Sequence, residues 1–383
     1  MIPYGRQNIS QQDIAEVIDV LQSDYLTQGP KVPEFEEKVS NYAQAKYAIA
    51  VNSATSALHI ACLALDVKNN DIVWTSPISF VASANCALYC GALIDFIDID
   101  TTTGNICVNA LAKKLAKAAV NNCLPKVIIV VHLAGQSCDM HEINALTKPY
   151  GIKLIEDASH AIGARYNDLP VGNCHYSDIC IFSFHPVKII TSAEGGMALT
   201  NSTQLMEKMR LYRSHGVTSD TDKMTEPSHG PWYYQQIALG FNYRMTDLQA
   251  ALGISQLNRL DEFVNKRNTL AKNYDNAFKN TNLRCLTPSN NKYSAYHLYI
   301  ILLPDNNAEK HKATVINLRE KDIYAHVHYI PIHLQPYYQQ LGFSLGDFPN
   351  AERYYKNAIT LPLYPDLTEE EQQYIIATVK SLV

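Results

Sequence analysis

The sequence of 383 residues contains no run of roughly 18 apolar residues, so it predicts no helix that crosses a membrane. The first residues also lack a basic region followed by an apolar stretch, and we therefore expect a cytoplasmic protein. Charge of one sign is not in large excess, because the net charge is only -5. This balance argues against nucleic acid or an anionic membrane as the main partner.

Two further patterns are missing. The nine cysteines are scattered and contain no C-x-x-C pair, and Cys86 and Cys90 fall four apart on an apolar helical pattern. We therefore expect reduced cysteines in the core rather than disulfides or a zinc site. No G-x-G-x-x-G motif follows the first expected strand, which argues against a nicotinamide-dependent dehydrogenase.

What the sequence does contain is a regular alternation of strand-like and helix-like segments. Strands are expected at 47–51, 72–75, 92–97, 127–132, 152–156 and 178–182, and helices near 79–90, 109–121 and 141–150. Such alternation predicts an α/β fold with a mostly parallel sheet that is covered by helices on both faces. We expect a large domain over residues 1–258 and a small α+β domain over 259–383, with a long loop at about 217–239.

Three expected strands are followed by polar residues that could bind a ligand or react with one. The segments NSATS (52–56) and EDASH (156–160) follow two of them, and Lys188 follows a third among apolar and small residues. Ligands on parallel sheets bind at the carboxyl ends of strands. A buried lysine has a lowered pKa and can form a Schiff base with a carbonyl, although a surface lysine is the plainer alternative.

The segment NSATS has a second property of interest. A strand, a small polar loop and a helix N-terminus together form a common phosphate-binding arrangement, because free N–H groups and the helix dipole point at the anion. Ordinary capping of the helix by serine or threonine is the alternative.

The full set of motifs resembles one family. It comprises NSATSAL (52–58), SPISFVASAN (76–85), IEDASHAIGA (155–164), FSFHPVKIITSAEGG (182–196), RSHG (213–216) and GFNYRMTDLQAALGISQL (240–257). In this order and spacing they resemble the DegT/DnrJ/EryC1/StrS nucleotide-sugar aminotransferases, which use pyridoxal 5'-phosphate (PLP). The resemblance implies fold type I of the PLP-dependent transferases and a homodimer with shared active sites.

The resemblance also implies roles for individual residues. Lys188 would bind PLP covalently and carry protons, and Asp157 would face the pyridine nitrogen. His160 would lie near the phenolic oxygen and Phe80 would stack on the ring, although either could instead be a core residue. The phosphate would be held by Ala54, Thr55, Ser183 and, from the partner subunit, Asn242.

Within the family, the likeness is to enzymes that aminate UDP-2-acetamido-2,6-dideoxy-4-hexulose for pseudaminic acid biosynthesis, with L-glutamate as donor. The substrate residues would be Tyr4, Asp24, Tyr25, Leu26, Thr27, His326, His328 and Tyr329, with segment 1–30 contributing to the site. His326 and His328 lack a further ligand for a metal. Arg213 and Arg244 are candidates for binding the donor carboxylate.

Two alternatives stay open at this point. The substrate could be another 3- or 4-keto hexulose linked to dTDP or GDP. The chain could instead be a non-catalytic sensor built on the same fold, although the presence of both Lys188 and Asp157 argues against that.

Overall fold

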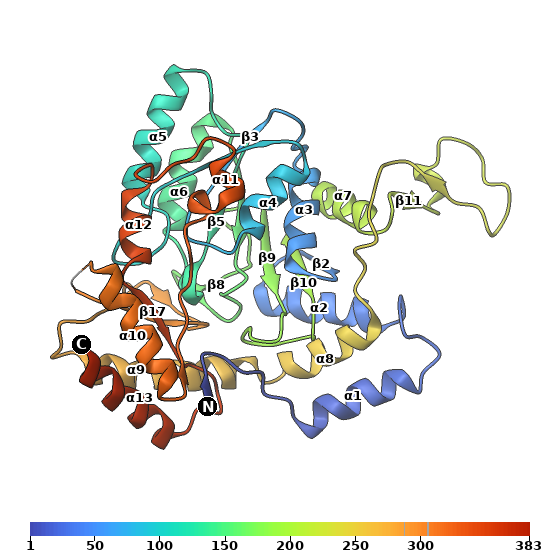
Figure 1. Ribbon diagram of the computed structural model, residues 1–383. Helices are drawn as coiled ribbons and strands as arrows, with labels where there is room; N and C mark the ends of the chain where they lie inside the picture. Colours follow the sequence, from blue (N-terminus) through green and yellow to red (C-terminus); the bar gives the residue numbers. More distant parts are fainter. Residues whose placement is uncertain (287, 305) are drawn as a thin grey trace.

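The computed structural model describes residues 1–286, 288–304 and 306–383. Its centre is a seven-stranded sheet in the order β2-β10-β9-β6-β5-β3-β4 (Figure 1). The strands are β2 (Tyr47–Val51), β10 (Gly196–Thr200), β9 (Ile179–Ser183), β6 (Lys153–Asp157), β5 (Val127–Val131), β3 (Ile72–Thr75) and β4 (Leu93–Phe96). Within the described residues, no helix is long and apolar enough to cross a membrane.

The strand pairing confirms the predicted α/β fold with a mostly parallel sheet. The neighbours from β9 to β4 are all parallel, whereas β10 is antiparallel to both β9 and β2. Because β10 is reversed relative to both neighbours, β2 runs in the same direction as β9. The carboxyl ends of β2, β6 and β9 therefore lie at the same edge of the sheet.

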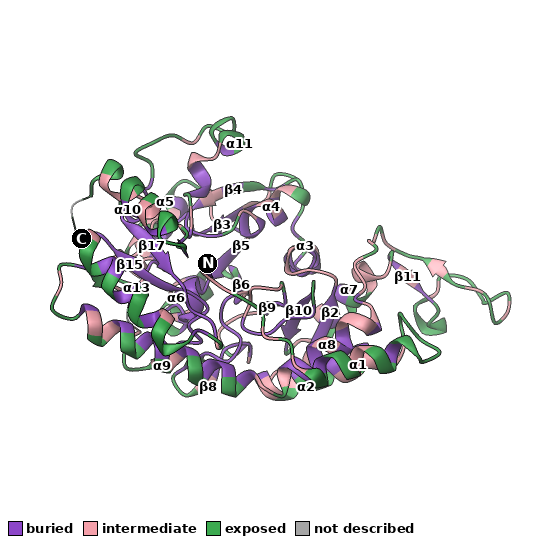
Figure 2. Cartoon of the chain, turned by 60° about the horizontal axis from the view of Figure 1, so that its bottom comes forward, coloured by how far each residue is buried: buried purple, intermediate pink, exposed green. Residues whose placement is uncertain are grey.

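Helices cover both faces of this sheet because successive strand residues point to opposite sides. In β5, for example, Ile129 joins the core under α3, α4 and α7, whereas Ile128 joins the core under α5 and α6. Helices α2 and α8 cover the second face at β10 and β9. These helices are α2 (Lys31–Ala43), α3 (Ala54–Ala64), α4 (Ala82–Tyr89), α5 (Val108–Val120), α6 (Met140–Thr147), α7 (Thr203–Arg213) and α8 (Asp247–Leu257). Figure 2 shows the central strands as buried.

The C-terminal part has its own core and its own antiparallel sheet, in the order β13-β15-β17. Its elements are α9 (Leu260–Phe278), β13 (Arg284–Cys285), β15 (Tyr299–Leu302), α10 (Ala308–Glu320), β16 (Ile323–Tyr324), α11 (Pro336–Gln339), α12 (Pro349–Tyr355), β17 (Ala358–Leu361) and α13 (Glu369–Leu382). The chain also begins here, since β1 (Ile2–Pro3) pairs with β16. The predicted division after residue 258 falls between α8 and α9 and stays a prediction.

The remaining elements lie at the periphery. A small sheet joins β7 (Arg165–Tyr166), β8 (Leu169–Pro170) and β14 (Lys292–Tyr293), and α1 (Gln11–Leu21) packs on α8. The predicted loop at 217–239 contains a strand pair, β11 (Val217–Thr218) with β12 (Gln235–Gln236). We call residues 217–239 the arm, because it extends away from the body of the molecule (Figure 1).

Candidate active site

Lys188 lies in the loop that follows β9, where its backbone N–H donates to the carbonyl of His185 at 2.9 Å. Burial lowers the pKa of the Lys188 amine to about 8, and the nearby Asp157 carboxylate raises it in partial opposition. None of the described residues forms a hydrogen bond or ion pair with its Nζ atom. At neutral pH about a tenth of this amine is therefore unprotonated and able to react, against well under a hundredth at the ordinary lysine pKa.

Asp157 is the last residue of β6 and is 5% exposed. Its Oδ2 accepts a hydrogen bond from the Ser83 hydroxyl at 2.6 Å. Its Oδ1 accepts from the Ser159 hydroxyl at 2.6 Å and from the Ser159 N–H at 3.2 Å. These three hydrogen bonds fix the orientation of the carboxylate.

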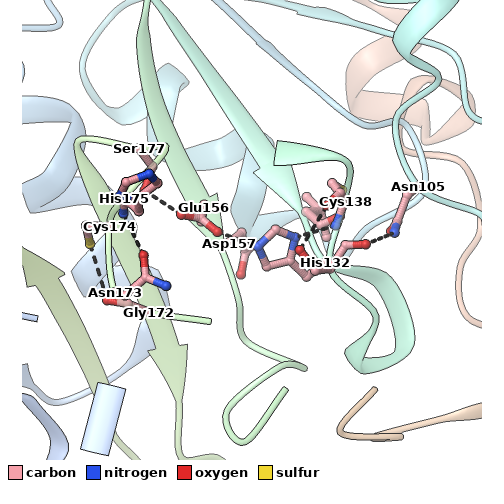
Figure 3. Close-up of polar contacts among 12 residues, drawn as sticks. Asn105, His132, Cys138, Glu156, Asp157, Gly172, Asn173, Cys174, His175 and Ser177 are labelled. Carbon is pink, nitrogen blue, oxygen red and sulfur yellow. Dashed lines mark hydrogen bonds and ion pairs between the residues drawn. The ribbon is translucent and has the colours of Figure 1, made fainter. Parts of the chain in front are cut away.

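The neighbouring acid, Glu156, points to the opposite face of the sheet, as alternate strand residues do (Figure 3). Its Oε2 lies 2.7 Å from His132 Nε2, and its Oε1 accepts from the Ser177 hydroxyl at 2.5 Å. The Cys138 N–H donates to His132 Nδ1, so Nε2 carries a ring proton and donates it to Glu156. Glu156 is thus engaged on the opposite face of the sheet, and Asp157 is the carboxylate on the Lys188 side.

His160 is buried beside these groups. Burial, followed by the charges of Lys188 and His328, holds its pKa well below the ordinary histidine value, so the ring is neutral. The Ala134 N–H donates to Nδ1 at 3.3 Å, which places the ring proton on Nε2. Nε2 in turn donates to the Tyr329 hydroxyl at 3.0 Å. The sequence predicted both residues for the site, and the structure joins them directly.

The predicted substrate residues fall into two groups. We call the first the ring group: Tyr4, His326, His328 and Tyr329. The Tyr4 ring lies 5.4 Å from His326 and 5.0 Å from His328, centroid to centroid. The first residues of the chain reach this place because β1 pairs with β16. A Cβ placed on Gly5, which follows Tyr4, would lie 3.8 Å from Val187 Cβ, so the chain passes beside the loop that carries Lys188.

The second group is an exposed turn, residues 24–27, which contains Asp24, Tyr25, Leu26 and Thr27. It lies against the start of α8: Thr27 bridges to Thr246, and the Leu26 carbonyl accepts from the Asp247 N–H at 3.0 Å. Asn242 is four residues before Thr246, and its side chain is exposed. We call the turn 24–27 together with Asn242 the turn group.

The N-terminus of α3 lies at the end of β2. Ser53 caps the helix by accepting the Ser56 N–H at 3.1 Å, whereas the N–H groups of Ala54 and Thr55 have no acceptor among the described residues. Gly196 of β10 lies against this turn, and a Cβ there would be 2.5 Å from the Ser53 carbonyl oxygen. Only glycine allows this close approach. This turn at the start of α3, residues 52–56, therefore offers free N–H groups at a helix N-terminus, as an anion requires. We call it the cradle.

Comparison with known proteins finds one family that matches nearly the whole chain. Residues 7–380 match the model of the DegT/DnrJ/EryC1/StrS aminotransferase family. The chain belongs to this family. It is an aminotransferase of fold type I, as the motifs predicted, and the family's cofactor is PLP.

Curated relatives of this aminotransferase align over its full length. UDP-4-amino-4,6-dideoxy-N-acetyl-beta-L-altrosamine transaminase of Campylobacter jejuni is 39% identical, covering 100% of this chain and 98% of the relative. The spore coat polysaccharide biosynthesis protein SpsC of Bacillus subtilis is 37% identical, covering 100% and 97%.

Solved structures agree with the sequence relatives. Helicobacter pylori PseC, an aminotransferase of pseudaminic acid biosynthesis, superposes with a TM-score of 0.91 at 34% identity, covering 100% of this chain and 98% of that one. A Streptococcus pneumoniae protein solved in its PLP form has a TM-score of 0.90 at 30% identity, covering 100% of this chain and 98% of that one.

The residues of this aminotransferase fit PLP. The free N–H groups of Ala54 and Thr55 suit the phosphate, the unpaired amine of Lys188 suits the aldehyde, and Asp157 suits a protonated pyridine nitrogen. Phe80 follows β3 and is 61% exposed, so its ring is accessible to a ligand. Ser183 ends β9 at the same edge of the sheet.

Two parts of this site were not predicted from the sequence, and one of the two candidates for the donor carboxylate is engaged elsewhere. Ser83, which holds Asp157, stood unnoticed within the motif SPISFVASAN, and Gly196 ended another motif without a role. Arg213 is not available to a donor carboxylate, because its NH1 atom is bonded to Glu36 at 2.5 Å and to the Ala50 carbonyl at 2.8 Å. Arg244 forms no side-chain hydrogen bond within the described residues and stays a candidate.

Proposed function

We propose that the protein transfers the amino group of L-glutamate to the C4 keto group of UDP-2-acetamido-2,6-dideoxy-4-hexulose. The product would be UDP-4-amino-4,6-dideoxy-N-acetyl-β-L-altrosamine, a precursor in pseudaminic acid biosynthesis. The observation that carries this proposal is the full-length likeness to the transaminases of that name from C. jejuni, at 39% identity. A relative of the same name from H. pylori is 35% identical.

The chemistry follows from the side chains at the edge of the sheet. When bound, PLP supplies a carbonyl that holds the amino group in transit and a ring that withdraws electrons. Lys188 Nζ removes the proton from the donor carbon that bears nitrogen and later returns a proton to C4 of the sugar. Asp157 keeps a positive charge on the pyridine nitrogen favourable, and His160, held neutral, is a hydrogen-bond donor without adding charge.

The ring group is the proposed site for the nucleotide sugar. Tyr4, His326 and His328 offer ring faces, which suit the flat uracil and the apolar faces of a sugar. The Tyr329 hydroxyl accepts from His160, so its own proton is free to be donated to a substrate oxygen. These groups border Lys188, as the effect of its charge on His160 and His328 indicates.

We propose further that the protein is a homodimer in the cytoplasm, and that the turn group serves the partner's site. Several large apolar side chains support a covered surface: Ile14 (42% exposed), Ile18 (44%), Leu21 (57%), Trp232 (75%) and Leu239 (79%). The first three lie on one face of α1, which leads directly into the turn group. A second copy of the chain would cover these residues and bring Asn242 to the neighbour's phosphate.

A steady-state comparison of sugars tests the substrate. With L-glutamate as donor, kcat/KM should be highest for the UDP-linked 4-keto sugar and far lower for dTDP- or GDP-linked keto hexuloses. A higher value for a dTDP- or GDP-linked sugar would contradict the substrate and leave the aminotransferase assignment intact. A purified protein that takes up no PLP would contradict the enzyme altogether and favour the sensor.

A further inference from the structure

The strand β2, which leads into the phosphate cradle, lies at the edge of the central sheet. An edge strand leaves every second residue with an N–H and a carbonyl that no neighbouring strand can satisfy. Ala50 is such a residue, and two buried side chains satisfy both of its groups. Its N–H donates to Glu36 Oε1 at 2.9 Å, and its carbonyl accepts from Arg213 NH1 at 2.8 Å.

Glu36 and Arg213 also bind each other, since NH1 lies 2.5 Å from Oε1. Their side chains are only 9% and 16% exposed, so the ion pair is largely shielded from water. We call the pair with Ala50 the clamp. It takes the place of a neighbouring strand at the point where β2 is about to enter the cradle, two residues before Asn52.

The clamp also holds the segment that carries Asn242. Arg213 is the last residue of α7, and its carbonyl accepts the Tyr243 N–H at 3.1 Å. The Tyr243 carbonyl in turn accepts the Asn52 N–H at 2.9 Å. One ion pair thus connects three pieces: the end of β2, the cradle that follows it, and the strand-like segment around Asn242.

From this geometry we infer that Glu36 and Arg213 are positioning residues for the cofactor phosphate. Their side chains contact each other and the backbone of Ala50, so they would act on the phosphate through β2. They fix the backbone of β2, and so the directions of the free N–H groups of Ala54 and Thr55. The inference rests on the proposed location of the phosphate at the N-terminus of α3.

A comparison of PLP with pyridoxal, which lacks the phosphate, isolates this effect. Loss of positioning should weaken PLP and leave pyridoxal nearly unchanged, whereas general damage to the fold should weaken both. For Arg213→Met we expect the dissociation constant of PLP, measured by titration of the apoprotein, to rise about tenfold, as for a misaligned hydrogen bond to a charged group. The ratio of the pyridoxal and PLP constants should fall by the same factor.

Arg210 provides a matched control. It reaches the other oxygen of Glu36 at 3.4 Å, but its side chain is 47% exposed. An exposed ion pair of this length contributes little. Arg210→Met removes the same chemical group from the same helix and should leave the PLP to pyridoxal ratio at the wild-type value.

Two further variants separate the possible failures. Gly196→Ala pushes on the cradle itself, so a ratio that it leaves unchanged would show that the phosphate binds elsewhere. If Gly196→Ala lowers the ratio and Arg213→Met does not, the clamp has no positioning role and the inference is overturned. If Arg213→Met fails to fold, Glu36→Gln tests the inference instead. This variant is milder, because the amide oxygen of glutamine can still accept the Ala50 N–H. It should lower the ratio less but in the same direction, and an unchanged ratio would again overturn the inference.

Discussion

At the scale of the residue, the site depends on the amine of a half-buried lysine, which has no hydrogen-bond partner among the described residues. Lys188→Ala removes that amine, while the phosphate cradle and Asp157 remain. The variant should fold, bind PLP without a covalent link, and lose the visible absorption of that link together with turnover. Absorption spectroscopy and an amino-transfer assay check this.

Lys188→Arg is the informative control for the same position. Arginine keeps the positive charge and much of the length, but it stays protonated and cannot bind an aldehyde covalently. It should therefore be as inactive as the alanine variant. Wild-type turnover in either variant would refute the role of Lys188.

The lowered pKa of Lys188 predicts a pH dependence. Only the unprotonated amine attacks the aldehyde, and its pKa is about 8 because burial disfavours the charged form. Below that pH the rate at which PLP attaches to the apoprotein should rise about tenfold per pH unit, and above it the rate should level off. Stopped-flow absorption measures the profile. A midpoint at the ordinary lysine value, more than two units higher, would contradict the buried environment.

Asp157→Asn tests the carboxylate at the end of β6. The amide keeps the shape but removes the charge that favours a protonated pyridine nitrogen. We expect kcat to fall on the order of 10²-fold or more, with a smaller effect on PLP affinity. A nearly unchanged kcat would place some other group at that nitrogen. Ser83→Ala removes one hydrogen bond to the Asp157 carboxylate and should lower kcat by a smaller factor.

At the scale of the element, the sequence predicted the parts that show a clear period. The strand at 127–131 was recognisable as a continuous apolar run, and the helix near 109–121 was recognisable because its apolar residues recur at helical spacing. The strands β11 and β12 were not, because two residues are too short for a period. The direction of β10 was also not predictable, because a buried antiparallel strand has the same apolar sequence pattern as a buried parallel strand.

The site residues that lie within sequence motifs were predicted, and those outside the motifs were not. Lys188, Asp157 and His160 stood in recognisable segments at strand ends. The clamp was not predictable, because Glu36 and Arg213 are 177 positions apart and each reads as an exposed helical charge. Their burial depends on where α2 and α7 pack around β2, which only the assembled sheet determines.

The exposed apolar face of helix α1 leads to a prediction about the dimer interface. Ile14, Ile18 and Leu21 face outward, which we attribute to a second copy of the chain. Ile18→Glu buries a charge in that interface and should shift the protein from dimer to monomer without changing its helix content. Gln11→Glu adds the same charge at the exposed first residue of α1 and should leave the dimer intact. Light scattering coupled to gel filtration checks both, and an unchanged dimer for Ile18→Glu would show that α1 does not line the interface.

At the scale of the whole molecule, the proposed dimer shares its sites. Lys188→Ala and Asn242→Asp should each abolish or cripple activity alone, the second because it sets a negative charge beside a phosphate. When the two variants are unfolded and refolded together, a mixed dimer has one intact site, with Lys188 from one chain and Asn242 from the other. About half the dimers are mixed, so roughly a quarter of wild-type activity should return.

The refolded mixture has a clear negative outcome. The backbone of Asn242 lies beside Asn52 of its own chain, whose side chain donates to the Asn242 carbonyl at 3.3 Å. If chains exchange and the mixture stays inactive, Asn242 serves the site of its own chain and the two sites are independent.

The central claim is the transfer of an amino group to C4 of a UDP-linked keto sugar. Incubation of the purified protein with ¹⁵N-labelled L-glutamate and UDP-2-acetamido-2,6-dideoxy-4-hexulose, followed by NMR of the product, tests it most directly. The product should carry a ¹⁵N amine bonded to C4 of the intact UDP-sugar, formed together with 2-oxoglutarate. An unaltered sugar, or a label on another carbon, would contradict it.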